Sequence, residues 1–591
     1  MAVVTDMTRA LAHPSMVEQW VAYADGQERR VRLPGRPDAV AGAEEVTYRT
    51  TLSDPRGPSD EIAVLKLAGL YAHAEIDVAG RFDGEGPITH NTYFAPVSVP
   101  FVPDWETELS VRCHRPKDRF GGIYETDCVA SEQRVPGIWW DVDVETGGLP
   151  YLERLEVTPE YGESGVKLRV RTSILATESA ERRITYSVRP EGESRGRGMM
   201  ERRTVETAEN DRTVVEHTVA LRDPTRWFPC GVGTQNRHVL RAKLDEQERT
   251  VTFGVRDAAF DDGAIRLNGE VVPIRGVNLL DATPADVERA ATLNANLVRF
   301  VGHVPPRAVY DACDRTGMLI WQDLPLTGAG SFDVDRGRAL ARALANQSAS
   351  YPSVVVFSVH NEPVSVADGL GPGFIDRLRL RWRAWRTTYD DTDAKAVAEE
   401  LPDPTFPAVC GPGQNARAVA YYPGWRYGKP SDIAQLLARY PASVVAAYGA
   451  PSNTETGFSQ ETVLQTVTEQ LRYERTGAIA CGLRDGVPES VGVYDQQGNP
   501  KPTRAVLARA FEPVQAVLTN PSGKKSTVAV VNDTTHKHEL TVSVTADEQL
   551  ATFELEVGAD DVWESDPVRI PQNQEITLAL TGGTVDIENS Y

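Results

Sequence analysis

A glutamate that directly follows an apolar run is the residue of this sequence best placed for acid–base chemistry. Glu362 and its neighbour Asn361 come soon after the stretch VVVFSV and stand just before Pro363. A short run of this kind is typical of a buried strand, so the carboxyl group would lie at the strand's rim. A carboxyl group in that position suits a general acid. The Asn361–Glu362 pair therefore predicts a functional site.

Further polar and aromatic side chains follow other apolar stretches, and they would surround one opening if these stretches are parallel strands. Carboxylates, amides, imidazoles and aromatic rings around one mouth suit a sugar site, because aromatic faces stack on pyranose rings and carboxylates hydrogen-bond hydroxyl groups. The candidate members are Asn278, Asp281, Arg299, His303, Gln322, Asp323, His360, Tyr421, Tyr422, Trp425, Arg426, Tyr448, Arg484 and Asp485.

Simpler explanations stay open for several of these side chains. Arg299 could pair with Asp323 or Glu362 in a buried structural network, and such pairing would not exclude a role in the site. His303 and His360 could be neutral, hydrogen-bonded histidines. A metal site is not favoured, because no third ligand is placed by spacing. We expect no metal and no cofactor.

The elements that would position these residues alternate between apolar strands and helical stretches from about residue 262 to 515. Eight β/α units over about 250 residues match the size of a (β/α)8 barrel, whose active site lies at the carboxyl ends of its strands. A doubly wound open sheet is the alternative, although it more often has about five or six strands. The strand candidates are 273–280, 297–303, 318–326, 353–363, 407–413, 417–425, 443–449 and 477–485.

Alternating stretches on both sides of this region predict β domains. Before the barrel they include EIAVLKLAGL, TELSVRCH, VKLRVRTSI and RRITYSVRP, and after it STVAVVND and HELTVSVTA. We therefore divide the chain into an N-terminal segment (1–20), two consecutive β domains (21–150 and 151–258), a TIM barrel (259–515) and a small C-terminal β domain (516–591).

The composition fits a multidomain globular protein and excludes several other classes. The 591 residues are 41% hydrophobic and 25% charged, so disorder is not the main state. Asp and Glu number 84 against 62 Lys and Arg, for a net charge of −22. An acidic chain repels phosphate backbones, so we expect no nucleic-acid partner. No run of 18 apolar residues occurs, so we expect no membrane partner.

Cysteine and lysine usage indicate the protein's surroundings. The six cysteines show no metal-ligand spacing, and the N-terminal residues do not resemble a secretory leader, so we expect a cytoplasmic protein. Only 10 of the 62 basic residues are lysines. A GC-rich genome and a surface adapted to high salt, as in a halophile with an acidic proteome, both explain this balance.

In order and spacing, these segments resemble glycoside hydrolase family 2, the family of β-galactosidases, β-glucuronidases and β-mannosidases. The resemblance covers about residues 45–515. Its segments are FDDGAIRLNGEVVPIRGVNLLD, NANLVRFVGHVPPRAVYDACDRTGMLIWQDLPL, YPSVVVFSVHNEP, AYYPGWRYG and DQQGNPKP. Upstream, VLKLAGLYAHAEIDVAG resembles the family's sugar-binding jelly-roll domain, and DPTRWFPCGVG through TVTFGVRD resembles the end of its immunoglobulin-like domain.

The resemblance implies a retaining glycosidase in which one glutamate protonates the leaving oxygen and a second attacks the anomeric carbon. By position, Glu362 matches the acid/base, and Asn361 matches the neighbour that binds the sugar 2-hydroxyl. The substrate is then a carbohydrate, a β-glycoside or oligosaccharide. Because members of the family often associate, a homo-oligomer is a further expectation. The remaining substrate-binding candidates are Arg299, His303, Asp323, His360, Tyr422, Trp425 and Asp485.

The departure from the family pattern is on the seventh strand. The family has Ser-Glu-Tyr/Phe-Gly there, with Glu as the nucleophile, whereas this chain has Ala446-Ala447-Tyr448-Gly449. Ala447 thus occupies the position of the nucleophile, and its methyl group cannot attack a sugar. The usual covalent mechanism is therefore missing.

Two hypotheses follow, and a third is weaker. The first is a glycoside hydrolase with unconventional chemistry, in which Glu455 or Glu461 swings in, Asp323 or Asp485 activates a water, or the substrate supplies a nucleophile such as a 2-acetamido group. The second is an inactive relative, a pseudoenzyme that binds carbohydrate or a protein partner through the old cleft. The third is a structural subunit of a larger assembly.

Overall fold

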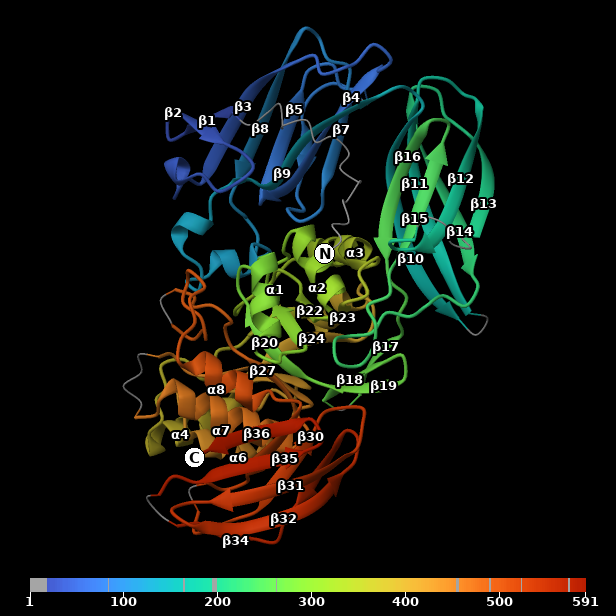
Figure 1. Ribbon diagram of the computed structural model, residues 1–591. Helices are drawn as coiled ribbons and strands as arrows, with labels where there is room; N and C mark the ends of the chain where they lie inside the picture. The colour runs from blue at the N-terminus through green and yellow to red at the C-terminus, as the bar shows by residue number, and fades with distance from the viewer. Residues whose placement is uncertain are drawn as a thin grey trace. The chain divides into compact units, whose positions relative to one another are not determined.

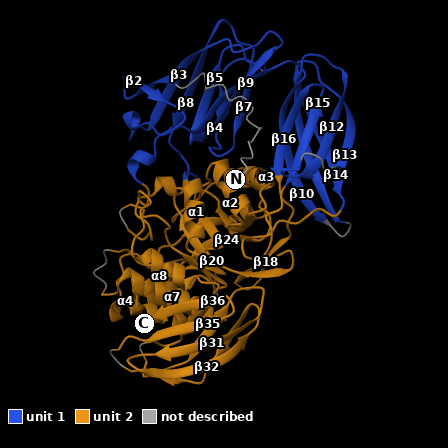
Figure 2. Ribbon diagram, in the orientation of Figure 1, with its two compact units in different colours: residues 1–121, 130–222, 238–252 blue, residues 122–129, 223–237, 253–591 orange. Residues whose placement is uncertain are grey.

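The computed structural model describes residues 19–591 except 83, 163–164, 194–198, 262, 453–456, 488–489, 522 and 572–573 (Figure 1). Most of the predicted N-terminal segment, and the loop residue Glu455, therefore lie outside the described residues. The chain forms two compact units (Figure 2). The first comprises residues 1–121, 130–222 and 238–252, and the second comprises 122–129, 223–237 and 253–591.

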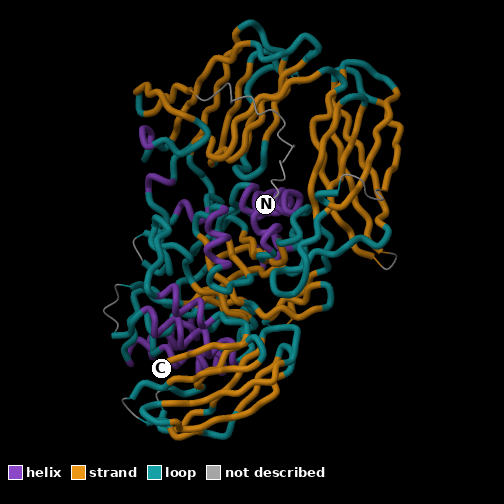
Figure 3. The backbone as a smooth tube through the Cα atoms, in the orientation of Figure 1, coloured by secondary structure: helices purple, strands orange, loops and turns teal. Residues whose placement is uncertain are grey.

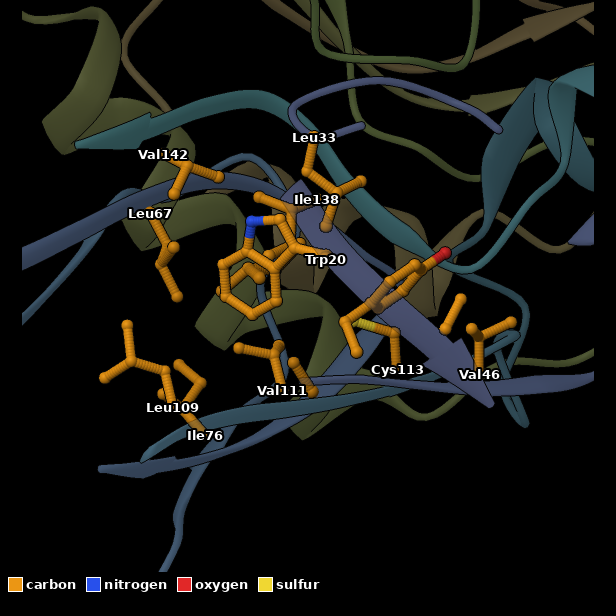
Figure 4. Packing of buried hydrophobic residues seen from close by; sticks show 14 of the residues in the cluster. Trp20, Leu33, Val46, Leu67, Ile76, Leu109, Val111, Cys113, Ile138 and Val142 are labelled. Carbon is orange, nitrogen blue, oxygen red and sulfur yellow. The ribbon is translucent and has the colours of Figure 1, made fainter. Parts of the chain in front are cut away.

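The first unit contains two β domains, as the alternating stretches predict. In the first domain, a core around the indole of Trp20 lies between two sheets (Figure 4). One sheet has the order β2-β1-β3-β8-β5-β6 and the other β7-β4-β9. The strands are β1 (Gln19–Ala24), β2 (Gln27–Arg32), β3 (Glu45–Ser53), β4 (Ile62–Tyr71), β5 (His73–Val78), β6 (Ile88–His90), β7 (Val97–Phe101), β8 (Glu106–His114) and β9 (Gly137–Gly147).

The second β domain has one three-stranded and one four-stranded sheet, in the orders β10-β11-β14 and β13-β12-β15-β16. Alternate residues of β11 are buried, which is the pattern of a strand with one face on the core. The strands are β10 (Tyr151–Gly162), β11 (Gly165–Ala176), β12 (Glu181–Pro190), β13 (Met199–Glu206), β14 (Asp211–Leu221), β15 (His238–Leu244) and β16 (Gln247–Phe253).

Eight parallel strands close into a barrel in the second unit, which confirms the predicted fold and the order of its strands. The strands are almost wholly buried, because helices cover the outside while side chains fill the inside. They are β20 (Arg275–Leu279), β21 (Leu297–Phe300), β22 (Leu319–Asp323), β23 (Val354–Asn361), β24 (Thr405–Cys410), β25 (Ala418–Ala420), β26 (Val444–Tyr448) and β27 (Gly477–Ala480). A small sheet of β17 (Ala258–Asp261), β18 (Ala264–Leu267) and β19 (Glu270–Pro273) precedes them.

All α-helices of the described residues belong to the barrel region, whereas the short helical segments that Figure 3 also draws in the first unit are 3-10 helices. Thr283 and Asp286 form the capping box that starts α1, as expected of the Thr-Pro pair there. Gly317 ends α2 in the left-handed conformation. No helix connects β24 to β25. None of the described helices is long and apolar enough to cross a bilayer. The helices are α1 (Pro284–Ala291), α2 (Arg307–Thr316), α3 (Val334–Ser348), α4 (Phe374–Arg386), α5 (Thr392–Ala398), α6 (Ile433–Arg439), α7 (Gln460–Tyr473) and α8 (Thr503–Ala510).

The C-terminal residues form a β domain with its own apolar core. Its sheets have the orders β28-β30-β33, β29-β34 and β32-β31-β35-β36. The strands are β28 (Val514–Leu518), β29 (Lys525–Ser526), β30 (Val528–Asn532), β31 (His538–Thr545), β32 (Gln549–Val557), β33 (Asp561–Glu564), β34 (Val568–Arg569), β35 (Thr577–Gly582) and β36 (Val585–Ser590).

Two buried carboxyl groups join this domain to the barrel. The Asp533 carboxylate accepts hydrogen bonds from Arg275, Arg472 and Arg475 at 2.8–3.1 Å. Burial opposes its ionisation, but the three guanidinium groups outweigh burial and lower the pKa of Asp533 to about 2. Glu469 on α7 instead accepts from neutral groups, the Tyr591 hydroxyl and the Asn589 amide. Burial therefore raises the pKa of Glu469 to about 7.

Candidate active site

Arg299 on β21 is the centre of a buried polar network in the barrel. Its Nε and Nη2 donate to the two carboxylate oxygens of Asp323 on β22 at 3.0 and 2.7 Å. Nη2 also donates to Asn361 Oδ1 at 2.8 Å, and Nη1 donates to the Ala446 carbonyl at 3.2 Å. Of the two carboxylates that the sequence left open as partners, Asp323 is the one that Arg299 binds. The guanidinium group thereby ties four barrel strands together.

The Asp323 carboxylate is fully occupied by this network. Besides Arg299, it accepts from the backbone N–H of Gly302 at 3.1 Å and from the hydroxyl of Ser358 on β23. Asp323 has no exposed surface. Its oxygens are therefore committed to counterbalancing Arg299 and are not presented to a substrate or an attacking water in this conformation.

Glu362 stands at the end of β23 in an unusual backbone conformation. Its φ is +45°, in the left-handed region that non-glycine residues seldom adopt and that is often found at functional sites. Its N–H donates to the Val409 carbonyl on β24 at 2.8 Å, so the strand pairing continues up to the glutamate. The residue itself is half-buried, so it reaches the mouth of the barrel.

A tyrosine hydroxyl holds the Glu362 side chain. Tyr422, which follows β25, donates to Glu362 Oε1 at 2.7 Å. Burial, followed by the neighbouring Glu362 charge, raises the pKa of Tyr422 well above its usual range, so the phenol keeps its proton. The hydrogen bond therefore runs from tyrosine to carboxylate and fixes where the carboxylate points.

Ala447 lies near the carboxyl end of β26, where the strand contains an extra residue. Val445 and Tyr448 pair with Ala478 and Ala480 of β27, so three steps along β26 oppose two along its partner. Tyr448 points away from the barrel axis, because its hydroxyl hydrogen-bonds Thr468 on helix α7. The extra residue interrupts the regular alternation of side chains at this point, and Ala447 is buried near the end of the strand.

Aromatic rings form one wall beside Glu362. Tyr422 and Trp425 pack edge to face, with ring centroids 5.2 Å apart. The guanidinium of Arg426 lies 4.4 Å from the Trp425 ring centroid and pairs with Asp368 at 2.9 Å. Trp425 is half-buried, so part of its surface remains for a sugar ring.

Three further candidates use their polar atoms within the protein. His303 accepts from the Ala282 N–H through Nε2, and its Nδ1 contacts the Val301 carbonyl. The ring nitrogens of His360 bond the Tyr389 hydroxyl and the Gly328 carbonyl. Asp485 pairs with Lys501 at 2.9 Å and accepts from the Gly492 N–H. In this conformation these side chains shape the mouth rather than present free groups to it.

No known family profile matches the chain. A putative β-glucuronidase of Formosa agariphila is 22% identical over 341 residues, which are 53% of this chain and 39% of that protein. A β-mannosidase B of Thermothelomyces thermophilus is 24% identical over 453 residues, 66% of this chain and 50% of that protein. The chain thus spans about half the length, or less, of these curated relatives.

Solved structures show the same fold over nearly the whole chain. A β-D-mannosidase from Dictyoglomus thermophilum covers 97% of this chain and is itself 88% covered, with a TM-score of 0.71 at 16% identity. An exo-chitosanase from Amycolatopsis orientalis covers 98% and is 84% covered, with a TM-score of 0.73 at 16% identity. The chain is similar to glycoside hydrolase family 2 enzymes in sequence and in fold. The resemblance seen in the sequence is therefore confirmed, while the substitution at Ala447 stays a prediction.

Sequence reasoning missed several residues of this family 2-like barrel. Ser358, which binds Asp323, was detectable as the one polar residue of VVVFSV. Lys501 lies in the DQQGNPKP segment, but nothing in the sequence assigns it to Asp485. Asn278 was noted only as a strand-end residue; its Nδ2 donates to the Ala446 carbonyl, and its buried Oδ1 has no hydrogen-bond partner among the described residues.

Proposed function

We propose that this chain acts on β-linked glycosides at the mouth of its barrel, with Glu362 as the general acid and no covalent nucleophile. The hydrogen bond from Tyr422 to Glu362 carries the proposal, because it holds a carboxyl group at the mouth directly beside the Arg299–Asn361 network. The names of the relatives, β-glucuronidase and β-mannosidase, support a β-glycoside as the substrate class.

In the reaction, Glu362 gives its proton to the glycosidic oxygen as the bond from that oxygen to the anomeric carbon breaks. The leaving group departs as a neutral alcohol, and the electron deficiency at the anomeric carbon must be met from the opposite face. Ala447 is the residue that we assign to that face, and it offers only a methyl group. Turnover then depends on a nucleophile that the protein does not supply.

The two aspartates that could activate a water are poorly placed for it. Asp323 is bound by Arg299, Ser358 and the Gly302 N–H, and Asp485 is bound by Lys501. Glu461 lies in the first turn of α7. We therefore favour strongly attenuated hydrolysis, with a small anion or the substrate's own 2-acetamido group as the remaining nucleophile. The same observation favours carbohydrate binding without turnover as the second candidate function.

Aryl β-glycosides with good leaving groups test this proposal, in a panel that covers galactosides, glucuronides, mannosides and glucosaminides. We expect slow turnover in buffer and acceleration by azide or formate, with a glycosyl azide of inverted configuration as product. Glu362→Gln should lower anion-dependent turnover of substrates with poor leaving groups. Sugar binding by calorimetry without turnover in any anion would establish the binding function instead. A protein that shows no turnover and binds no sugar would contradict both candidate functions.

A further inference from the structure

Helix α4 carries an exposed apolar stripe that the glycoside site does not use. Among the described residues, five of the eleven large apolar side chains that are exposed lie on this one helix. Trp385 is 81% exposed and Trp382 is 54% exposed. The other members of the stripe are Phe374, Ile375 and Leu378. Such a patch marks an interaction surface when its members are contiguous.

The five side chains do form one face. With 100° between successive helical residues, they fall within an arc of about 100°. The opposite face attaches the helix to the rest of its unit through the small buried pair Leu380 and Ala384. Arg383 adds a hydrogen bond to the Asp368 carbonyl. The helix therefore presents larger apolar side chains outward than inward.

Arginines border the stripe on both sides. By the same helical geometry, Arg381 lies on one flank and Arg379 and Arg386 lie on the other. Of these, only Arg379 has an acidic partner, Asp376 on the same helix. Arg381 and Arg386 form no ion pair with any described residue. The helix holds five arginines and one aspartate, in a chain whose net charge is −22.

The apolar stripe with arginines on both sides favours one kind of binding partner over others. A second copy that packs its own α4 against this one would bring arginine flanks together, which like charges disfavour. A glycan chain suits exposed tryptophans but gains little from Ile375 and Leu378, which offer no polar group to its hydroxyls. An anionic lipid surface matches both features, because acyl chains take the apolar stripe and headgroups take the arginines.

We propose that α4 lies on anionic lipid bilayers, with its stripe at the acyl boundary and Arg381 and Arg386 among the headgroups. The expectation of no membrane partner rested on the lack of a long apolar run, which a helix lying in the interface does not need. Binding is then peripheral, reversible and weakened by salt.

Flotation of the full-length protein with vesicles tests this proposal. We expect binding to vesicles of phosphatidylcholine and phosphatidylglycerol, weaker binding to phosphatidylcholine alone, and release by salt. The variant Trp382→Ser/Trp385→Ser should lower the partition coefficient about tenfold or more, and Arg381→Glu/Arg386→Glu should lower binding only to the anionic vesicles. Trp105→Ser is the matched control, because Trp105 is 86% exposed and lies outside the stripe.

Three results would overturn the proposal. The first is no binding of the wild-type protein to anionic vesicles. The second is an equal loss of binding in Trp105→Ser. The third is a wild-type dimer, seen by analytical ultracentrifugation, that the double tryptophan variant converts to monomer, which would assign the stripe to a second copy. Folding of each variant is checked by circular dichroism. Because both tryptophans are exposed, we expect their replacement to leave the fold intact.

Discussion

The Tyr422 hydroxyl donates a 2.7 Å hydrogen bond to Oε1 of Glu362, and this contact joins the end of the fourth barrel strand to the end of the sixth. Glu362 reaches this position in a left-handed backbone conformation, one residue after Asn361 binds Arg299. The acid of the proposed reaction is thus held from two directions. One is its own strand and the other is the tyrosine.

Tyr422→Phe removes the hydroxyl and leaves Glu362 free to rotate. We expect kcat for azide-dependent turnover of a glycoside with a poor leaving group to fall roughly tenfold or more, while KM changes little. Tyr421→Phe is the matched control, because the Tyr421 hydroxyl donates to the Tyr440 carbonyl instead. Equal loss in the two variants would contradict a specific role for Tyr422 in positioning Glu362.

Asp323→Ala leaves the buried Arg299 guanidinium without its bidentate partner. Removal of one member of a buried ion pair commonly lowers the free energy of unfolding by about 3–5 kcal/mol, and urea denaturation would measure the loss. Glu400→Gln, which breaks the exposed pair with Arg342, should have little effect. A loss in Asp323→Ala no larger than in Glu400→Gln would show that the network does not support the barrel.

Asp533 makes stability depend on pH at the acid end. Its pKa is about 2 in the folded chain against an ordinary 3.8, so below pH 3.8 the unfolded chain binds a proton that the folded chain does not. The stabilisation, about 2 kcal/mol, is therefore complete above about pH 5 and lost as pH falls toward 2. Asp533→Asn should flatten this acid limb in denaturation curves measured from pH 2 to 5, and an unchanged limb would refute the assignment.

Glu469 should have the opposite effect on stability, which it lowers as pH rises. Its folded pKa of about 7 lies above the ordinary 4.5, so the unfolded chain releases this proton first as pH rises. Stability should fall between pH 4.5 and 7, by roughly 3 kcal/mol, and then level off. Glu469→Gln should remove this decline and make the protein more stable than wild type at pH 8. A decline that persists in the variant must come from other groups.

Most of the fold was predictable because its strands have hydrophobic patterns that can be recognised within a few residues. Runs such as VVVFSV and alternating stretches such as VKLRVRTSI became β23 and β11, in the predicted order along the chain. The direct passage from β24 to β25 without a helix agrees with the predicted strand bounds, 407–413 and 417–425, which leave too few residues for a helix between them. The exact domain boundaries stay predictions.

The sequence named candidate site residues, whose roles stay predictions, but it did not give their contacts. Position at strand ends and resemblance singled out Glu362, Arg299 and Tyr422, but partners across strands depend on register and side-chain direction. Hence the choice of Asp323 for Arg299, and of Lys501 for Asp485, emerged only from the structure. The type and spacing of a residue predict the strand at whose end it lies, but they do not predict its hydrogen-bond partner.

Replacement of Ala447 by glutamate tests the central claim most directly. If Ala447 stands where the nucleophile is expected, Ala447→Glu should gain hydrolysis of an aryl β-glycoside with retained anomeric configuration and without added azide, whereas the isosteric Ala447→Gln should not. Nuclear magnetic resonance of the first-formed sugar reports the configuration. A folded Ala447→Glu protein with no gain over Ala447→Gln, or wild-type hydrolysis that is already fast without any anion, would contradict the account.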